Sequence, residues 1–356
     1  MRNIIIAGLL LLGGGAVAQT QISQYQPGVT PEGAVYFLPK TALRIVVQVE
    51  KTTYTPGDFC KYAEKYFRLN DVDTEPSVSY KVGAINLTSY GVADKSKAYA
   101  VKFNAKSVAS NMVLADDGTL LAINTTAIRE DEPKKFVPAR KPAAVNPRQY
   151  MSSEILAAGS TAKMAELTAQ EIYDIRDSKN ELTRGEADYM PKDGEQLKIM
   201  LTKLEAQDHA LAQLFTGTIV KDTSEYVVTV CPDKEIDKQV LFRISQKLGL
   251  VESDDLSGVP YYISVKDEHS IPTQAVAPQN NKKKDKEDGI YVNVPGKIKV
   301  TVSKGNNMMS SFELYAAQFG NTELLSGDLF NKRYTTRLSL NPSTGSVNKL
   351  EAEQPK

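Results

Sequence analysis

The chain has 356 residues, of which 41% are hydrophobic and 24% are charged. This composition is typical of folded globular proteins, and the length allows two or three folded units of roughly 100 to 200 residues each. The 43 basic and 43 acidic residues leave a formal net charge of 0, so we expect no nucleic-acid partner.

Residues 1–18 have the pattern of a secretory signal peptide. Arg2 precedes an apolar run over residues 4–12, and Ala16-Val17-Ala18 supplies the small residues of a cleavage site. No cysteine lies directly after that site, and no later segment approaches the ~20 apolar residues that span a bilayer. The sequence therefore predicts export by the general route to the periplasm or outer cell surface. We expect a soluble mature chain that is not a lipoprotein and has no transmembrane segment.

Residues 19–124 are predicted to form a β-rich unit with one helix. Apolar and polar residues alternate over 43–49, which is typical of a half-buried strand, whereas 59–69 follow helical spacing. Further strands are predicted at 77–82, 84–90, 99–103, 112–114 and 119–123. Prolines and basic residues then alternate over 125–150, which predicts an exposed linker because proline interrupts both helices and sheets.

Residues 151–217 are predicted to form a hairpin of two antiparallel helices. Gly185 supplies a helix stop, and Asp193 with Gln196 resembles a capping box that starts the second helix near 194. The apolar stripe of that helix contains a carboxylate, Asp208, followed by His209. A charge on an apolar face must be paired, hydrated or neutralised. Asp208 is therefore either a paired structural carboxylate at the edge of the interface or part of a binding site.

The remaining chain is predicted to form antiparallel sheets. One β unit covers 218–266, with a polar turn at 222–225, and a second covers 290–356; a charged flexible loop over 267–289 separates them. Tyr261 and Tyr262 are candidates for stacking against a sugar ring. The fold class is thus α+β: a β-rich N-terminal unit with one helix, a central helical hairpin, and C-terminal sandwich-like sheets.

The two cysteines, Cys60 and Cys231, leave two alternatives open. In an oxidising compartment they can form a disulfide, which would stabilise the chain by about 4–5 kcal/mol because it closes a long loop. Otherwise they are two free thiols within structural elements. Spacing along the sequence does not decide between the two.

No recognised catalytic or metal-binding motif occurs in the sequence. The motifs of zinc hydrolases, serine hydrolases and phosphate-binding loops are absent, so we expect no catalytic residues, no metal and no cofactor. Ser160-Thr161-Ala162-Lys163 matches the S-x-x-K of penicillin-recognising enzymes, but it stands at a helix start, where Ser160 is more simply an N-cap. Carboxylate-dependent glycoside hydrolysis stays open, because its two acids can lie far apart in sequence.

Several short segments occur in a distinctive order. They are Tyr-Phe-Leu-Pro-Lys-Thr at 36–41, Pro-Gly at 56–57, Tyr-Ala-Glu-Lys-Tyr at 62–66, Leu-Phe-Thr-Gly at 214–217, Asp-Leu-Ser-Gly at 255–258, Ala-Gln-Phe-Gly at 317–320 and Asn-Pro-Ser-Thr-Gly at 341–345. In this order they resemble an uncharacterised secreted family of gut Gram-negative bacteria, catalogued as domain of unknown function 4831. The resemblance covers the whole mature chain. It implies an envelope or secreted location and supplies no activity or catalytic residue.

We therefore expect a secreted or periplasmic binding or scaffolding protein of the bacterial cell envelope rather than an enzyme. Its partner would be an envelope protein or a glycan. The alternative is a carboxylate-dependent hydrolase that acts on glycan or peptidoglycan. A polar acidic cleft with raised carboxyl pKa values would favour the hydrolase, and an exposed apolar patch would favour a partner.

Overall fold

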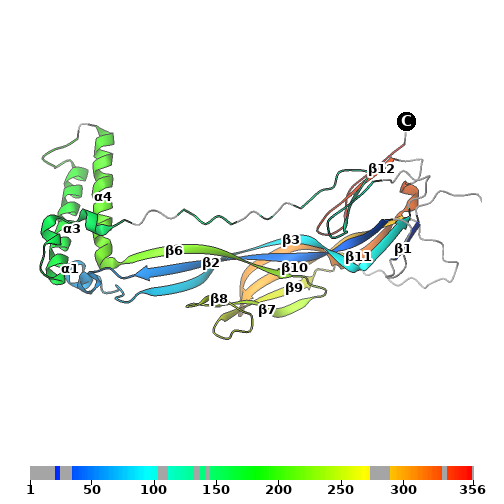
Figure 1. Cartoon of the computed structure of the whole chain (residues 1–356), viewed down its shortest axis with the longest axis horizontal. Helices are drawn as coiled ribbons and strands as arrows, with labels where there is room; N and C mark the ends of the chain where they lie inside the picture. The colour runs from blue at the N-terminus through cyan, green and yellow to red at the C-terminus, as the bar shows by residue number, and fades with distance from the viewer. Residues whose placement is uncertain are drawn as a thin grey trace, which may run out of the picture.

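The computed structural model describes residues 21–24, 34–102, 111–130, 133, 136–140, 145–191, 193–272, 289–330 and 335–354. The predicted signal peptide lies outside the described residues, as do residues 273–288 of the predicted charged loop. The protein is α+β and mostly antiparallel sheet, with the α-helices gathered at one end of an elongated molecule (Figure 1).

Thirteen strands and seven helical segments are present in the described residues. The strands are β1 (Gln21–Gln24), β2 (Ala34–Thr55), β3 (Ser77–Lys102), β4 (Met112–Leu114), β5 (Leu120–Ile123), β6 (Thr218–Val230), β7 (Ile236–Ser245), β8 (Gly249–Val251), β9 (Val259–Asp267), β10 (Gly289–Lys304), β11 (Asn307–Ser326), β12 (Thr335–Leu340) and β13 (Val347–Glu353). The α-helices are α1 (Ala63–Phe67), α2 (Ser153–Leu156), α3 (Thr161–Arg184) and α4 (Gly194–Thr216). The 3-10 helices are η1 (Cys60–Tyr62), η2 (Pro147–Tyr150) and η3 (Gly327–Phe330).

A sheet in the order β1-β3-β2-β6 forms the long axis of the molecule. The three strands predicted at 77–82, 84–90 and 99–103 are instead parts of one 26-residue strand, β3, which pairs with the 22-residue β2. The turn predicted at 222–225 is also wrong, because β6 runs through it without interruption and pairs with β2 along its whole length. The polar side chains of residues 222–225 are exposed or half-buried, so placing them in a strand costs little folding free energy.

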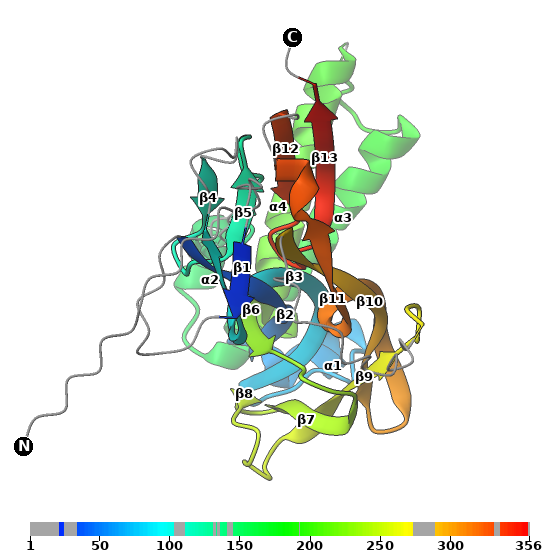
Figure 2. The ribbon, with the colours of Figure 1, turned by 90° about the vertical axis from the view of Figure 1, so that its right-hand side faces the viewer.

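Two further sheets pack around this axis, in the orders β11-β10-β9-β7-β8 and β13-β12-β5-β4. Figure 2 looks along the axis and places β4, β5, β12 and β13 on one side of β2 and β3, with β7 and β8 on the other. One apolar core lies between β2–β3 and the five-stranded sheet and includes Ile45, Val47, Ile263 and Val300. A second core, which includes Tyr36, Leu120 and Leu338, lies under the β12–β5 sheet. Strands from the two ends of the chain therefore share sheets.

The helical end has a core of its own, as the predicted hairpin requires. Ile172 and Ile175 of α3 pack with Leu211 and Phe215 of α4, and all four side chains are buried. The ring of Phe215 also contacts aromatic rings from the loop between β2 and β3, at centroid distances of 5.4 Å to Phe59, 6.4 Å to Tyr66 and 4.8 Å to Phe67. Aromatic packing therefore joins the hairpin to the loop that caps the β2–β3 arm.

Local capping chemistry sets the limits of both long helices. Ser160 Oγ accepts a hydrogen bond from the Lys163 backbone N–H at the start of α3, and Gly185 ends that helix with a φ of 75°. Asp193 Oδ1 accepts from the Glu195 N–H at the start of α4. The serine of the S-x-x-K segment is thus the helix cap that the sequence predicts, and the ammonium of Lys163 pairs with Glu166 at 2.9 Å.

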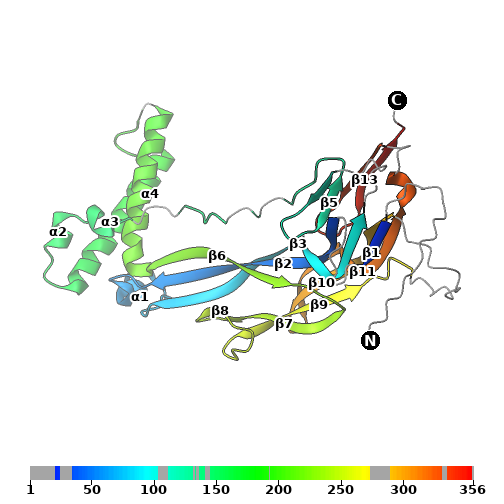
Figure 3. The same ribbon diagram turned by 45° about the vertical axis from the view of Figure 1, so that its right-hand side comes forward.

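Between the helical end and the two packed sheets, β2, β3 and β6 form an arm (Figure 3). Among the described residues, no helix is both long enough and apolar enough to cross a membrane.

Candidate functional site

A network of buried polar contacts joins four distant segments at the end of β2 that lies away from the helices. Asn293 of β10 is 1% exposed, and its side-chain Nδ2 donates to the backbone carbonyls of Pro39, at 3.0 Å, and Thr344, at 2.9 Å. Its Oδ1 accepts from Lys97 Nζ at 3.2 Å. Burial lowers the pKa of Lys97, while the nearby Asp94 acts in the opposite direction. We refer to this network as the Asn293 joint.

Thr41 extends the Asn293 joint to β11. Its hydroxyl donates to the carbonyl of Ser343 at 2.9 Å and accepts from the N–H of Ala317 at 3.0 Å. The Gln318 side chain bonds both backbone groups of Thr41, each at 2.9 Å. Because buried polar groups are costly unless they are paired, this network fixes β2 and β11 to the 341–345 turn in one arrangement.

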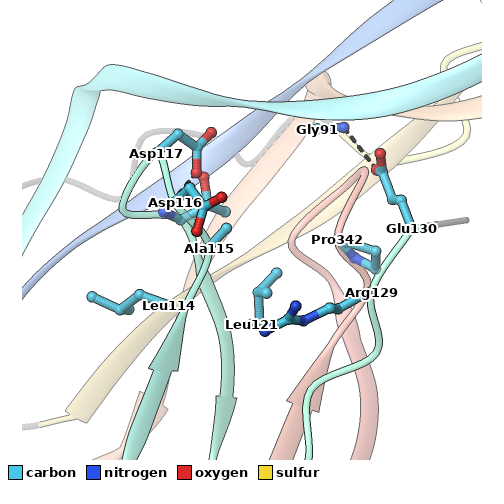
Figure 4. Close-up of a pocket in the computed structure, with 10 residues that line it drawn as sticks. Gly91, Leu114, Ala115, Asp116, Asp117, Leu121, Arg129, Glu130 and Pro342 are labelled. Carbon is cyan, nitrogen blue, oxygen red and sulfur yellow. Dashed lines mark hydrogen bonds between the residues drawn. The ribbon is translucent and has the colours of Figure 1, made fainter. Parts of the chain in front are cut away.

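A cleft of about 340 Å³ lies next to the Asn293 joint. Figure 4 shows Asp116 and Asp117, from the turn between β4 and β5, on one side of it and Arg129 and Glu130 on the other. Pro342 also lines the cleft and lies beside Arg129 and Glu130 in this view. The sequence predicted the strands on either side of this turn but not the cleft, whose lining includes residues as far apart in the chain as Gly91 and Pro342.

The carboxylates of the cleft are not equivalent. Both oxygens of Asp117 accept backbone hydrogen bonds, Oδ2 from Ala93 at 2.9 Å and Oδ1 from Thr119 at 3.0 Å, so this carboxylate holds the turn. Glu130 Oε1 accepts from the Gly91 N–H at 2.9 Å. Partial burial nevertheless raises the pKa of Glu130, and the charge of Asp117 acts in the same direction.

A buried hydroxyl lies beside these acids. Thr119 is 3% exposed, and its Oγ1 has no hydrogen-bond partner among the described residues. The cleft therefore combines an acid with a raised pKa, an exposed second acid in Asp116, a guanidinium and a hydroxyl that could bind water or a ligand. Chemically, it can bind a small polar group. Among the described residues, no cluster of three or more His, Cys, Asp or Glu side chains could hold a metal ion.

The structure places Asp208 in an ion pair. Its Oδ1 lies 3.0 Å from Arg176 Nε of α3, with side-chain exposures of 23% and 40%, respectively. The guanidinium of Arg176 also lies over the ring of Phe67, 5.5 Å from the centroid. Asp208 is thus paired, as the structural interpretation expects, and its partner Arg176 lies against the aromatic cluster of the helical end. His209 is exposed, with Nδ1 3.1 Å from Gln213 Nε2.

We predict that Asp208→Asn lowers the free energy of unfolding by only about 0.5 kcal/mol, because a half-exposed ion pair contributes little and the asparagine oxygen can still accept from Arg176. Urea unfolding of wild type and variant at the same pH would measure the difference. A loss above about 2 kcal/mol would contradict this structural role and indicate a buried charge network.

The other candidate binding residues are not brought together. Tyr261 is buried, and its ring stacks on Phe242 with a centroid distance of 4.7 Å, so it belongs to the core. Burial raises the pKa of its hydroxyl. Tyr262 is its neighbour on β9 and therefore points to the opposite face of the sheet. The two tyrosines therefore do not form one stacking platform. They lie on β9 of the five-stranded sheet, whereas Asp208 and His209 lie on α4 at the helical end.

The disulfide alternative is excluded within one chain. Cys60 and Cys231 are both free. Cys60 lies just beyond the end of β2 that pairs with Thr218, whereas Cys231 follows Val230 at the other end of β6. Thirteen strand residues separate these ends, which is about 40 Å at roughly 3.3 Å per residue. A disulfide needs Cα atoms within about 7 Å.

Comparison with known proteins places the chain in a family. Residues 32–348 match a family described as a domain of unknown function, DUF4831. The chain belongs to this family. No curated protein and no solved structure matches it.

The segments that carry the DUF4831 resemblance lie at junctions between elements. Residues 36–41, 317–320 and 341–345 build the Asn293 joint. Residues 56–57 and 214–217 meet at the helical end, where the Phe59 N–H donates to the carbonyl of Leu214 at 2.7 Å. In the turn before β9, Asp255 accepts from the N–H of Ser257 and the Gly258 carbonyl accepts from Arg243. In this chain, these segments therefore hold neighbouring elements together.

Proposed function

We propose that this protein is a non-enzymatic binding or scaffolding protein of the bacterial cell envelope, and that the helical hairpin presents its binding face. The observation that carries the proposal is the architecture: the helical end has its own core, and the three-stranded arm holds it away from the two packed sheets (Figures 1 and 3). Such spacing separates two surfaces that can contact different partners. An enzyme with one enclosed active site would gain nothing from this separation.

The first half of α4 offers the apolar surface that a partner needs. Ile199 is 60% exposed and lies in a shallow hollow with Glu195, Lys198, Thr202 and Lys203. The facing stripe, at Leu197, Leu201 and Leu204, is only half-buried against α3. Apolar residues rimmed by charges are typical of protein-binding surfaces. This face therefore suits an envelope protein better than a glycan.

Export supports the envelope location. The predicted signal peptide with its Ala16-Val17-Ala18 cleavage site would direct the mature chain to the periplasm or the outer cell surface. Because Cys60 and Cys231 do not form a disulfide within the chain, they give no support for an oxidising compartment. The proposed location therefore rests on the predicted signal peptide alone.

Affinity capture from native envelope extract, with crosslinking, tests this proposal. We expect wild type to retain a specific partner and Ile199→Asp to lose at least about 80% of it, because a charge at the centre of an apolar contact weakens binding strongly. Leu256→Asp is the matched control, since Leu256 is also an exposed aliphatic residue, at 84% against 60% for Ile199, and lies in the turn before β9. Equal retention by both variants would contradict a binding face on α4.

The raised pKa of Glu130 favours one alternative, a carboxylate-dependent hydrolase that acts on glycan or peptidoglycan at the cleft. Against it, both oxygens of Asp117 are used by backbone N–H groups, which leaves the exposed Asp116 as the second acid. If no partner were recovered while a glycan panel was turned over by wild type and not by Glu130→Gln, the hydrolase would replace the binding proposal.

A further inference from the structure

β6 is a long edge strand with few of the features that protect such edges. It pairs with β2 on one side, and no strand of the described residues pairs with the other. Its register with β2 shows no bulge, and it contains no proline. Proline, bulges, charges and short length are the usual devices that keep an edge from pairing with another chain. By contrast β1, β4 and β8 are at most 4 residues long, and β11 carries two register shifts.

The apolar side chains of β6 are exposed on both faces of the sheet. Ile219 and Val227 are 65% and 58% exposed on one face, and Val220 and Tyr226 are 44% and 38% exposed on the other. A strand with a free edge and apolar residues on both faces is suited to extending a sheet by one more strand.

The sequence of β6 is complementary to itself. If two copies pair antiparallel with Thr223 of each on the two-fold axis, Ile219 lies opposite Val227 and Val220 lies opposite Tyr226. Lys221 of each copy then lies opposite Glu225 of the other, which gives two symmetric pairs of opposite charge. All four exposed apolar residues thus meet apolar residues on the same face of the sheet.

Neighbouring registers lack this match. With the axis at Asp222, Ile219 lies opposite Glu225, and with the axis at Ser224, Lys221 lies opposite Val227. The chosen register does not depend on which β6 amides point outward, because an antiparallel two-fold axis can pass through a hydrogen-bonded or a non-hydrogen-bonded pair.

We propose that β6 pairs with β6 of a second copy of this chain, with Thr223 on the axis, so that the two four-stranded sheets become one continuous sheet. The partner is another copy because β6 itself carries the order of charges and apolar residues that matches this edge. This proposal does not depend on the binding face of α4, which lies on the hairpin and away from the edge.

A charge-swap experiment on the purified protein tests this register. We expect analytical ultracentrifugation to show a concentration-dependent dimer. Lys221→Glu and Glu225→Lys should each weaken dimerisation by about tenfold or more, because each turns two attractive pairs into two repulsive ones. The double variant restores opposite charges and should return to within about threefold of wild type. Thermal unfolding of each variant would establish that the fold is retained.

Crosslinking gives an independent measurement of the axis. Thr223→Cys should form a disulfide between copies under mild oxidation, because the two residues face each other. Thr229→Cys is the matched control: it is an exposed threonine on the same face of β6, but in this register it lies opposite Gly217. Wild type, with Cys60 and Cys231, gives the baseline. A purely monomeric wild type, or a dimer that neither single swap weakens and Thr223→Cys does not trap, would overturn the proposal.

Discussion

Gly57→Ala is expected to loosen the helical end from the arm and to lower its free energy of unfolding by about 3 kcal/mol. A Cβ at position 57 would lie 2.2 Å from the carbonyl oxygen of Leu214 and 2.4 Å from that of Gln213. These are backbone atoms at the end of α4, so the helix must shift as a whole. The shift would break the hydrogen bond from Phe59 N–H to the Leu214 carbonyl and separate the rings of Phe59 and Phe215.

Denaturant unfolding followed by far-ultraviolet circular dichroism measures this loss, since nearly all helix belongs to that end. Hydrogen exchange should show faster exchange in α3 and α4 than in β9 and β10. Gly159→Ala is the control, because a Cβ there meets nothing within 4 Å and the stability should change by less than about 0.5 kcal/mol. If the two alanine variants unfolded alike, the close approach at Gly57 would have no energetic importance.

Asn293→Ala should be at least as damaging, with a loss of about 3–4 kcal/mol in the unfolding of the sheets. The change removes the donor to the carbonyls of Pro39 and Thr344 and the acceptor for Lys97. Each buried group left without a partner costs roughly 1–3 kcal/mol. Differential scanning calorimetry would show the loss as a lower unfolding temperature.

Two further variants separate hydrogen bonding from packing at this position. Asn293→Asp keeps the size of the side chain and an acceptor for Lys97 but faces the two carbonyls with oxygen, so we expect it to destabilise the sheets as well. Asn307→Ala, at an exposed position at the start of β11, should have little effect. A stable aspartate variant would show that Asn293 fills space and does not hold the 341–345 turn by donation.

The helical hairpin could be predicted from the sequence because its signals are local. Ser160, Gly185 and Asp193 each act within a few residues of the helix end that they define, and the apolar stripe needs only one neighbouring helix. The same reasoning failed for the long strands. At both register shifts between β2 and β3 the extra residues belong to β3, between Val82 and Ile85 and between Ala93 and Ala98. Each shift interrupts the two-residue alternation of β3, so one strand is interpreted as several short ones.

The cleft and the Asn293 joint were beyond local reasoning for a different reason. Asn293 gave no signal in the sequence, since an asparagine in a strand is ordinarily a solvent-facing residue. Its importance comes from Pro39 and Thr344, which pairing between distant strands brings to it. Glu130 was assigned to an exposed linker because of the surrounding prolines, and only the contact with Gly91 of β3 shows that this part of the segment packs on the sheet.

The course of β2 through the molecule has a mechanical consequence. Its strand runs along the long axis from the Asn293 joint to the Gly57 contact, with β3 and β6 paired to it on either side. The ladder hydrogen bonds lie across that axis. A force that pulls the helical end away from the sheets would therefore act in shear on many of these hydrogen bonds at once. It would not break them one at a time. The arm is built to transmit tension along its length, while a sideways force would meet much less resistance.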